Sequence, residues 1–222
     1  MRKLDKTNIK ATAYQKWQKN LGKNGIKIPQ YSSNHKYYKD ILADLLIIQN
    51  GLCAYTEYRV LDETKVKSLS AKFDAKGQYV GHRPETPTDL EHFDSRIKPV
   101  NGWKWDNLFA VFSPINRDVK RVKERTITAN KILKPDTTNY SPTKYLDYDL
   151  LANIFYPKPG LTAKNKKVVG DMVVLLGINY GFIKMKRTEY ITEIVAKKKL
   201  GQNITAHQFL TSVSMTLIKL GL

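Results

Sequence analysis

The chain has 222 residues, of which 41% are hydrophobic, so it is long enough to bury a core and its composition argues against wholesale disorder. Lys and Arg total 38 against 20 Asp and Glu, which gives a formal net charge of +18. Such a surplus opposes compactness by self-repulsion and favours a polyanionic partner, nucleic acid before the anionic membrane surface. The single cysteine, Cys53, excludes an intrachain disulfide and a Cys-rich zinc site made by this chain alone.

The first residues, MRKLDKTNIK, are charged and have no apolar run behind them, so we expect no signal peptide. The most apolar segment, residues 168–183, contains an Asp and three Gly and is too short to span a bilayer. We therefore expect a cytoplasmic protein that binds a polyanion and has no membrane partner.

Residues 1–50 are predicted to form a helical N-terminal part. Within it, residues 32–51 have apolar side chains at helical spacing, with Ser33 or Asn34 able to cap the helix and Gly51 able to end it. Residues 52–61 are aromatic and β-branched, which predicts a strand. Residues 62–78 indicate a solvated hairpin or insertion, and Gly and Pro in residues 79–87 indicate a loop.

Two short strands are predicted at residues 90–93 and 108–112, and Pro114 suits the first turn of a helix through residues 115–126. Residues 134–150 read as a loop, and the stretch from Thr162 alternates helical apolar patches with lysine runs. We predict an α+β fold: a strand–strand–helix core at 51–130 embedded in a mostly helical chain, with helical material at 1–50 and 131–222, as one compact unit.

Polar residues of the predicted core would meet if the helix crosses the hairpin. Glu91 and His92 lie on the first strand, and Asn116 lies in the first helical turn. Carboxylate and amide oxygens are hard ligands that suit Mg²⁺, and an imidazole can take a proton from water at neutral pH. This combination is the minimum for one-metal phosphodiester hydrolysis.

The pairs Glu91–His92 and Asn107–Leu108, followed by Asn116, resemble the motif of the HNH (ββα-metal) endonuclease superfamily. The resemblance implies that His92 is the general base and that Glu91 and Asn116 bind one Mg²⁺ or Mn²⁺. It also implies that Asn107 pins the loop and orients His92. Three further residues are accessory candidates outside the family pattern: His82, Asp94 and Asp118.

The chain departs from this family at its zinc site. Many HNH proteins hold a structural zinc with two cysteine pairs, but here Cys53 is followed by Thr56, and the second pair would fall at Phe112 and Ile115. We therefore expect no structural zinc, with Phe112 and Ile115 closing the same space by hydrophobic packing.

Shorter stretches are similar to the HNH effectors of prokaryotic antiviral systems, the Septu-type and retron-associated (PtuB-like) nucleases. They are MRKLDK, CAYTE, residues 134–150 and residues 175–187. This resemblance implies an ATPase as partner protein, and the chain has no Walker loop with which to bind ATP itself.

Basic residues beside the motif are expected to contact phosphates: Lys104, Arg117, Lys120, Arg121 and Lys123. Trp103 and Trp105 either stack on bases or pack in the core. We expect a metal-dependent HNH endonuclease that cuts DNA as the effector of an antiviral defence complex. The alternatives are an RNA (tRNA) nuclease with the same site and a non-catalytic nucleic-acid-binding subunit.

Overall fold

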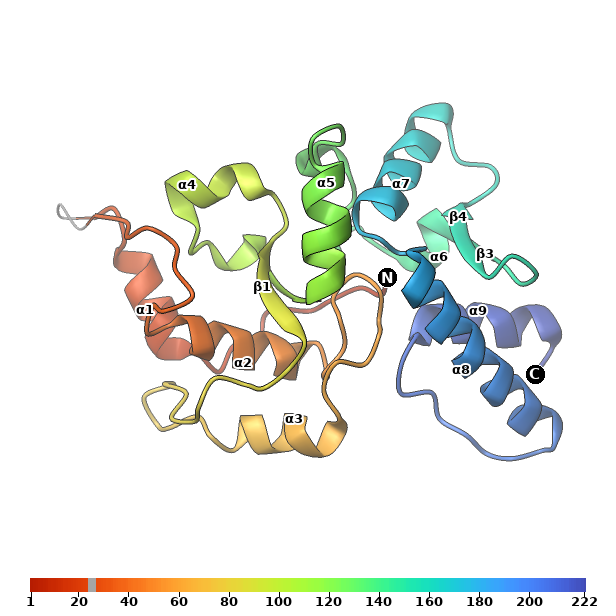
Figure 1. The fold of residues 1–222 in the computed structure, drawn as a ribbon, viewed down its shortest axis with the longest axis horizontal. Coiled ribbons are helices and arrows are strands. Elements are labelled where there is room, and N and C mark those ends of the chain that lie inside the picture. Colours follow the sequence, from red (N-terminus) through yellow and green to blue (C-terminus); the bar gives the residue numbers. More distant parts are fainter. Residues whose placement is uncertain (24–26) are drawn as a thin grey trace. The chain divides into compact units, whose positions relative to one another are not determined.

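The computed structural model describes residues 1–23 and 27–222 (Figure 1). Residues 24–26, which belong to the expected helical N-terminal part, lie outside the described residues. The chain divides into two compact units that are described separately below. The N-terminal unit comprises Leu4–Gly51 and Val60–Ser113, and the C-terminal unit comprises Met1–Lys3, Leu52–Arg59 and Pro114–Leu222.

The elements of the N-terminal unit are helices and one pair of strands. In chain order they are α1 (Thr12–Asn20), α2 (Tyr38–Ile48), α3 (Glu63–Ser70), β1 (Thr88–His92), η1 (Ser95–Ile97), α4 (Lys98–Asn101), η2 (Trp105–Asn107) and β2 (Leu108–Phe112). The C-terminal unit contains η3 (Ile115–Lys120), α5 (Arg121–Lys123), η4 (Ala129–Lys131), α6 (Pro142–Tyr145), β3 (Leu146–Asp149), β4 (Ile154–Pro157), α7 (Ala163–Leu175), α8 (Gly181–Lys199) and α9 (Leu210–Leu220). Together the described residues form helices and two small antiparallel sheets, which is the α+β class that we predicted.

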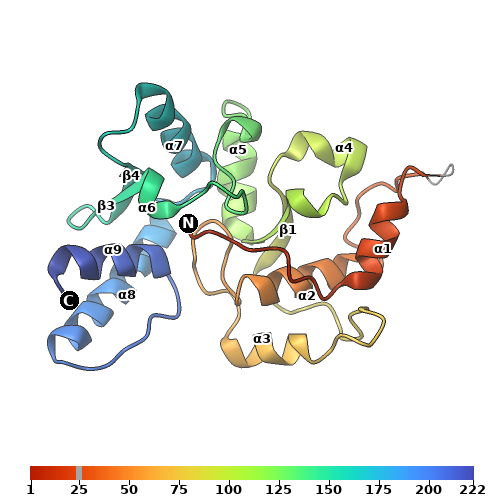
Figure 2. The same cartoon turned by 180° about the vertical axis from the view of Figure 1, so that it is seen from behind.

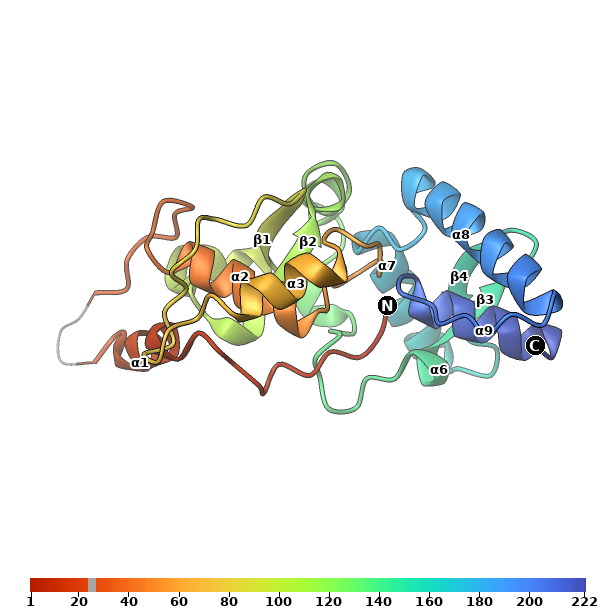
Figure 3. The same ribbon diagram turned by 90° about the horizontal axis from the view of Figure 1, so that it is seen from below.

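Helix α2 forms the core of the N-terminal unit and packs against both β1 and β2 (Figure 3). Its apolar residues at helical spacing, including Ile41 and Leu45, are fully buried. The predicted cap is wrong, because the helix begins after Tyr37 without a side-chain cap. Gly51 follows the helix with a φ of +67°, as expected of a residue after a helix end.

Strands β1 and β2 are antiparallel, with Leu90 opposite Ala110 and His92 opposite Leu108. A two-stranded sheet has two edges, and side chains satisfy both of them here. On the β1 edge the Tyr31 hydroxyl donates to Leu90 O at 3.0 Å, and Leu90 N donates to the Tyr38 hydroxyl at 3.2 Å. On the β2 edge the Gln49 side chain accepts from Ala110 N at 3.0 Å and donates to Ala110 O at 2.7 Å. The strand pair is therefore held on both sides at the level of Leu90.

The strand predicted at residues 52–61 is wrong. These residues form a tight turn with one isolated bridge between Leu52 and Arg59, in which Glu57 has a φ of +60°. The buried Glu57 carboxylate lies 3.2 Å from the Met1 amino group and accepts from Thr211 N at 2.7 Å. These contacts place the turn in the C-terminal unit. The predicted boundaries at 50 and 130 stay a prediction.

The predicted hairpin or insertion at residues 62–78 contains a helix. Asp62 caps α3 by accepting from Lys65 N at 2.8 Å, and Val66 and Leu69 turn inward from it. The remainder of this stretch is a turn closed by a bridge between Phe73 and Tyr79. The Asp62 cap therefore favours a helix at the start of this stretch instead of the predicted hairpin.

The C-terminal unit has three long helices and the β3–β4 hairpin, in which α8 and α9 lie side by side (Figure 2). The hairpin was missed, because β3 falls within the stretch predicted as a loop and no strand was predicted at β4. Buried Arg187 on α8 anchors the turn of the hairpin, because it donates to Asn153 O and also to Ile178 O, both at 2.8 Å. Over the described part of the chain, none of the helices has the length and apolar character to cross a membrane.

Two carboxylates on α2, Asp40 and Asp44, are buried one helical turn apart. Asp44 accepts from Ala11 N at 2.8 Å, whereas the Asp40 carboxylate has no hydrogen bond of normal geometry. Burial raises the pKa of Asp40 from 3.8 to about 6, against the opposing influence of the Tyr79 backbone and Lys39. The folded state thus holds a proton that the unfolded state releases at a lower pH.

We predict that Asp40→Asn stabilises the protein more at about pH 7.5 than at about pH 4.5, because the folded wild-type chain must ionise a buried carboxyl as the pH rises through 6. Thermal unfolding at the two pH values measures the difference. Asp171→Asn, which removes a half-buried carboxylate paired with exposed Lys167, is the control and should change little at either pH. A lower melting temperature for Asp40→Asn at pH 7.5 would contradict the prediction.

Candidate active site

The candidate site lies at the end of β1, where Glu91 and His92 are adjacent and buried, with 3% and 6% of their surface exposed. Successive strand residues point to opposite faces, so the two side chains leave the strand in different directions. Leu90, the preceding residue, is the one that Tyr31 and Tyr38 hold at the sheet edge. The backbone that carries Glu91 and His92 is therefore well anchored.

His92 is oriented by a backbone carbonyl. Its Nε2 lies 2.8 Å from Gly102 O, and a carbonyl oxygen can only accept, so Nε2 carries the proton of the neutral ring. The lone pair of the ring is then on Nδ1. The Tyr31 ring also meets the imidazole edge to face, with centroids 4.4 Å apart. This arrangement suits a base with one defined basic nitrogen.

Gly102 is required by a close approach of the chain to itself. A Cβ at this position would lie 2.7 Å from Tyr31 Cβ and 2.9 Å from Lys98 O, closer than ordinary packing allows. The sequence analysis missed both Tyr31 and Gly102. The only local signal was the Gly itself, between the two predicted strands.

Asn107 clamps the residues that follow His92. Its Oδ1 accepts from Asp94 N at 2.8 Å, its Nδ2 donates to Asp94 O at 3.0 Å, and its backbone carbonyl accepts from Phe93 N at 2.8 Å. These three hydrogen bonds connect Asn107 to the backbone of the two residues after His92. Its effect on the chemistry of His92 stays a prediction.

Asp94 has a structural position. Its carboxylate accepts from Arg96 Nε at 2.8 Å and from Arg96 Nη2 at 2.6 Å, and it also accepts from Arg96 N at the start of η1. A bidentate pair of this kind takes up both carboxylate oxygens. Asp94 is therefore a poor candidate for the accessory role that we considered.

The two tryptophans, which were expected either to stack on bases or to pack in the core, pack in the core. Trp103 is fully buried and donates from Nε1 to Pro29 O at 3.0 Å. Trp105 is buried too and donates from Nε1 to Lys6 O at 3.3 Å. Neither ring is available to stack on a base, so that reading is wrong.

Asn116 belongs to the C-terminal unit and lies in η3, which is a π-helical segment rather than the regular helix expected. The Arg121 N–H bonds to Asn116 O, five residues back. π-Helical segments are rare in proteins, and those that occur are often at functional sites. Asn116 is half-buried, and Asp118 is exposed.

The basic residues of this helix divide into two classes. Arg117, Arg121 and Lys123 are exposed, as is Lys104 of the N-terminal unit. Lys120, by contrast, is 1% exposed and its ammonium pairs with Glu124 one turn further on. A buried and paired ammonium is not placed for phosphate contact, so the expectation for Lys120 is wrong.

His82 is exposed and lines a small pocket of about 300 Å³ in the N-terminal unit, together with Lys65, Lys72 and Arg83. Its accessory role stays a prediction. Within residues 1–23 and 27–222 there is no group of three or more His, Cys, Asp or Glu side chains that could hold a metal ion. Glu91 belongs to the N-terminal unit and Asn116 to the C-terminal unit, so the expectation that they bind one cation stays a prediction.

Cys53, Phe112 and Ile115, which stand at positions where many HNH proteins have zinc cysteines, are all buried. No family model matches the chain, and a search of curated proteins finds no match. The resemblance to HNH nucleases therefore rests on the residues themselves.

We predict that Gly102→Ala disturbs His92, because the added methyl group must displace Tyr31 or the carbonyl that accepts from Nε2. Overpacking of this kind costs about 1–3 kcal/mol of folding stability. Nitrogen NMR of the imidazole should show the Nε2–H tautomer in the wild-type protein and a mixture in the variant. Gly181→Ala, where a Cβ meets nothing within 4 Å, is the control. An unchanged imidazole spectrum in Gly102→Ala would refute this account.

Proposed function

We propose that the chain is a metal-dependent endonuclease of the HNH type that hydrolyses phosphodiester bonds, with DNA as the favoured substrate. The observation that carries the proposal is the hydrogen bond from His92 Nε2 to Gly102 O, on the residue that follows buried Glu91 in β1. A buried imidazole with a defined basic nitrogen and a hard oxygen ligand are the two groups that this reaction needs.

The residues fit a divalent cation by the chemistry of their donors. Glu91 offers a carboxylate, and Asn116, the second ligand expected from the sequence, offers an amide oxygen. When bound, Mg²⁺ or Mn²⁺ would neutralise the scissile phosphate and stabilise the leaving oxygen. Asp94 is not needed as a ligand, since Arg96 already binds its carboxylate.

The chain's own residues handle the proton. His92 takes a proton from the attacking water at Nδ1, and the positive charge that develops on the ring is stabilised through Nε2–H by the Gly102 carbonyl. Asn107 keeps the loop after His92 in place through its two hydrogen bonds to Asp94. The imidazole thus does not need to reorient during the step.

Substrate binding is supported by charge. With a net charge of +18, the chain attracts any polyanion, and Arg117, Arg121 and Lys123 present exposed cations on one short helical stretch. These contacts read the phosphate backbone rather than the sugar. An RNA such as tRNA is therefore the alternative substrate for the same site.

The resemblance to Septu-type and retron-associated effectors supports a further part of the proposal, an ATPase partner within an antiviral defence complex. A non-catalytic nucleic-acid-binding subunit is the rival. The ordered contacts around His92 weigh against it, because a binding module has no need of a fixed imidazole tautomer.

We predict that His92→Ala abolishes Mg²⁺-dependent cleavage, with a loss of about 100-fold or more, because general-base catalysis contributes on that order. Plasmid DNA and tRNA, each with Mg²⁺ and with EDTA, are the substrates. His207→Ala, which alters an exposed histidine of the C-terminal unit, is the control and should cut as the wild-type chain does. Equal cutting by His92→Ala would rule out His92 as the base. If the wild-type chain cuts neither substrate, the binding-subunit alternative is favoured.

We predict that Arg121→Ala and Lys120→Ala differ in effect. Removing exposed Arg121 should weaken duplex binding and reduce the salt slope by about one. Removing Lys120 should leave the slope unchanged but lower the melting temperature, because Glu124 loses its buried partner. Fluorescence anisotropy at several salt concentrations and thermal unfolding separate the two. A reduced slope in Lys120→Ala would show that its ammonium reaches phosphate.

A further inference from the structure

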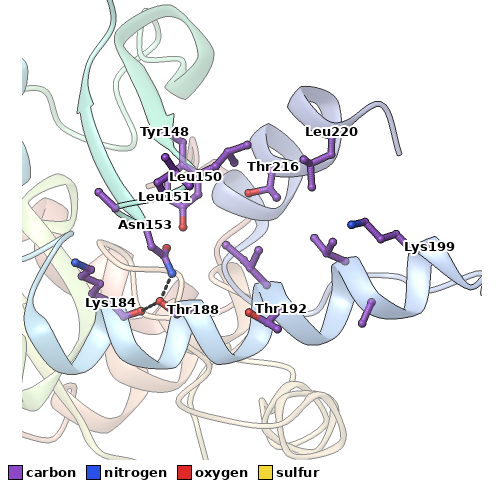
Figure 4. A pocket seen from close by; sticks show the side chains of 14 residues that line it. Tyr148, Leu150, Leu151, Asn153, Lys184, Thr188, Thr192, Lys199, Thr216 and Leu220 are labelled. Carbon is purple, nitrogen blue, oxygen red and sulfur yellow. Dashed lines mark hydrogen bonds between the residues drawn. The ribbon is translucent and has the colours of Figure 1, made fainter.

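The C-terminal unit contains a pocket of about 650 Å³ to which the nuclease proposal assigns no role (Figure 4). Its walls come from the β3–β4 turn, from α8 and from α9. The lining residues are Tyr148, Leu150, Leu151, Ala152 and Asn153 from the hairpin, Thr216 and Leu220 from α9, and seven residues of α8.

The pocket is long in one direction. On α8 its lining begins at Lys184 and ends at Lys199, with Thr188, Ile191 and Val195 between them on the same helix face. Fifteen residues of helix at 1.5 Å per residue give a length of roughly 22 Å. That length matches about four turns of a second helix rather than a compact small molecule.

The walls of this groove are apolar and open. Leu151 is 100% exposed, and Leu150 and Leu220 are also exposed. Three exposed leucines around one concave surface are more than the scattered apolar residues of an ordinary surface. They indicate a surface that is covered by something apolar.

One buried hydroxyl lines the groove without a partner. Thr216 is 3% exposed, and its hydroxyl has no hydrogen bond among the described residues. The Tyr148 hydroxyl differs, because it interacts with the Arg187 guanidinium, which lies 5.6 Å from the Tyr148 ring. Buried polar groups are nearly always satisfied, so an occupant that offers a hydrogen-bond acceptor would complete this site.

The charges around the groove indicate what charge its occupant should carry. Lysines stand at both ends of the α8 face, Lys184 and Lys199, and no acidic residue lines the groove. The nearby carboxylates of Glu189 and Glu193 on α8 are paired with Lys186 and Lys197. A second copy of this chain is a poor occupant, because its own helical surface is lysine-rich and would bring like charges together.

We propose that this groove binds an acidic amphipathic helix of a partner protein, with leucine-like side chains against Leu150, Leu151 and Leu220. Carboxylates at its two ends meet Lys184 and Lys199, and a central acceptor meets the hydroxyl of Thr216. The proposal does not rest on nuclease activity, because every residue named lies in the C-terminal unit. The proposal specifies a partner protein with an acidic amphipathic helix, whereas the net charge of +18 indicates only that some polyanion binds.

The test is selection from a random peptide display library, with peptides of about 15 residues to match the groove. On the wild-type protein we expect enrichment of sequences with apolar residues at helical spacing and a negative net charge. Leu151→Asp should weaken the selected peptides by about tenfold or more. Ile218→Asp, an equally drastic change at an exposed α9 residue outside the groove, should not.

A charge reversal gives the second arm. Lys199→Glu changes an exposed side chain, and we expect the selected peptides to carry a basic residue at that end. Circular dichroism checks the fold of each variant, and His92→Ala should bind the same peptides, which separates this proposal from the nuclease proposal. No enrichment, enrichment of basic or non-amphipathic peptides, or binding insensitive to both Leu151→Asp and Lys199→Glu would overturn it.

Discussion

The N-terminal unit depends on how the two edges of its small sheet are closed. A pair of five-residue strands is marginal by itself, since each strand presents unpaired backbone groups on its outer side. Tyr31 and Tyr38 satisfy the outer groups of Leu90, and Gln49 satisfies those of Ala110, the residue opposite. Side chains from the α2 region thus take the place of neighbouring strands, and the same tyrosine that closes one edge also holds the imidazole beside it.

The parts of the fold that the sequence predicted are those with a local cause. The apolar period of α2, the two strands around residues 90 and 110 and the helical C-terminal stretch all follow from patterns within about ten residues. The turn at residues 52–59 was misread because Glu57 is held by Thr211, more than 150 positions away. No local propensity contains that contact, and it overrides the β-branched character of the segment.

The candidate site divides in the same way. Glu91, His92 and Asn107 are close in sequence and form a recognisable pattern, whereas Tyr31 contacts His92 across about 60 residues. The Gly102 carbonyl is a backbone atom, and its role has no side-chain signature. Lys120 was misassigned because charge alone predicts exposure, and only packing shows that its ammonium turns inward to Glu124.

The π-helical segment η3 has a consequence for how this chain can vary. A π turn is in effect one residue inserted into an α-helix, so every side chain beyond it is rotated by about 100° relative to the uninterrupted helix. Asn116 precedes this offset, and Arg121 and Lys123 follow it. A single-residue deletion here would leave the composition and net charge of the helix almost unchanged. It would nevertheless rotate the cations by about 100° relative to Asn116, so the length of this segment matters as much as its residues.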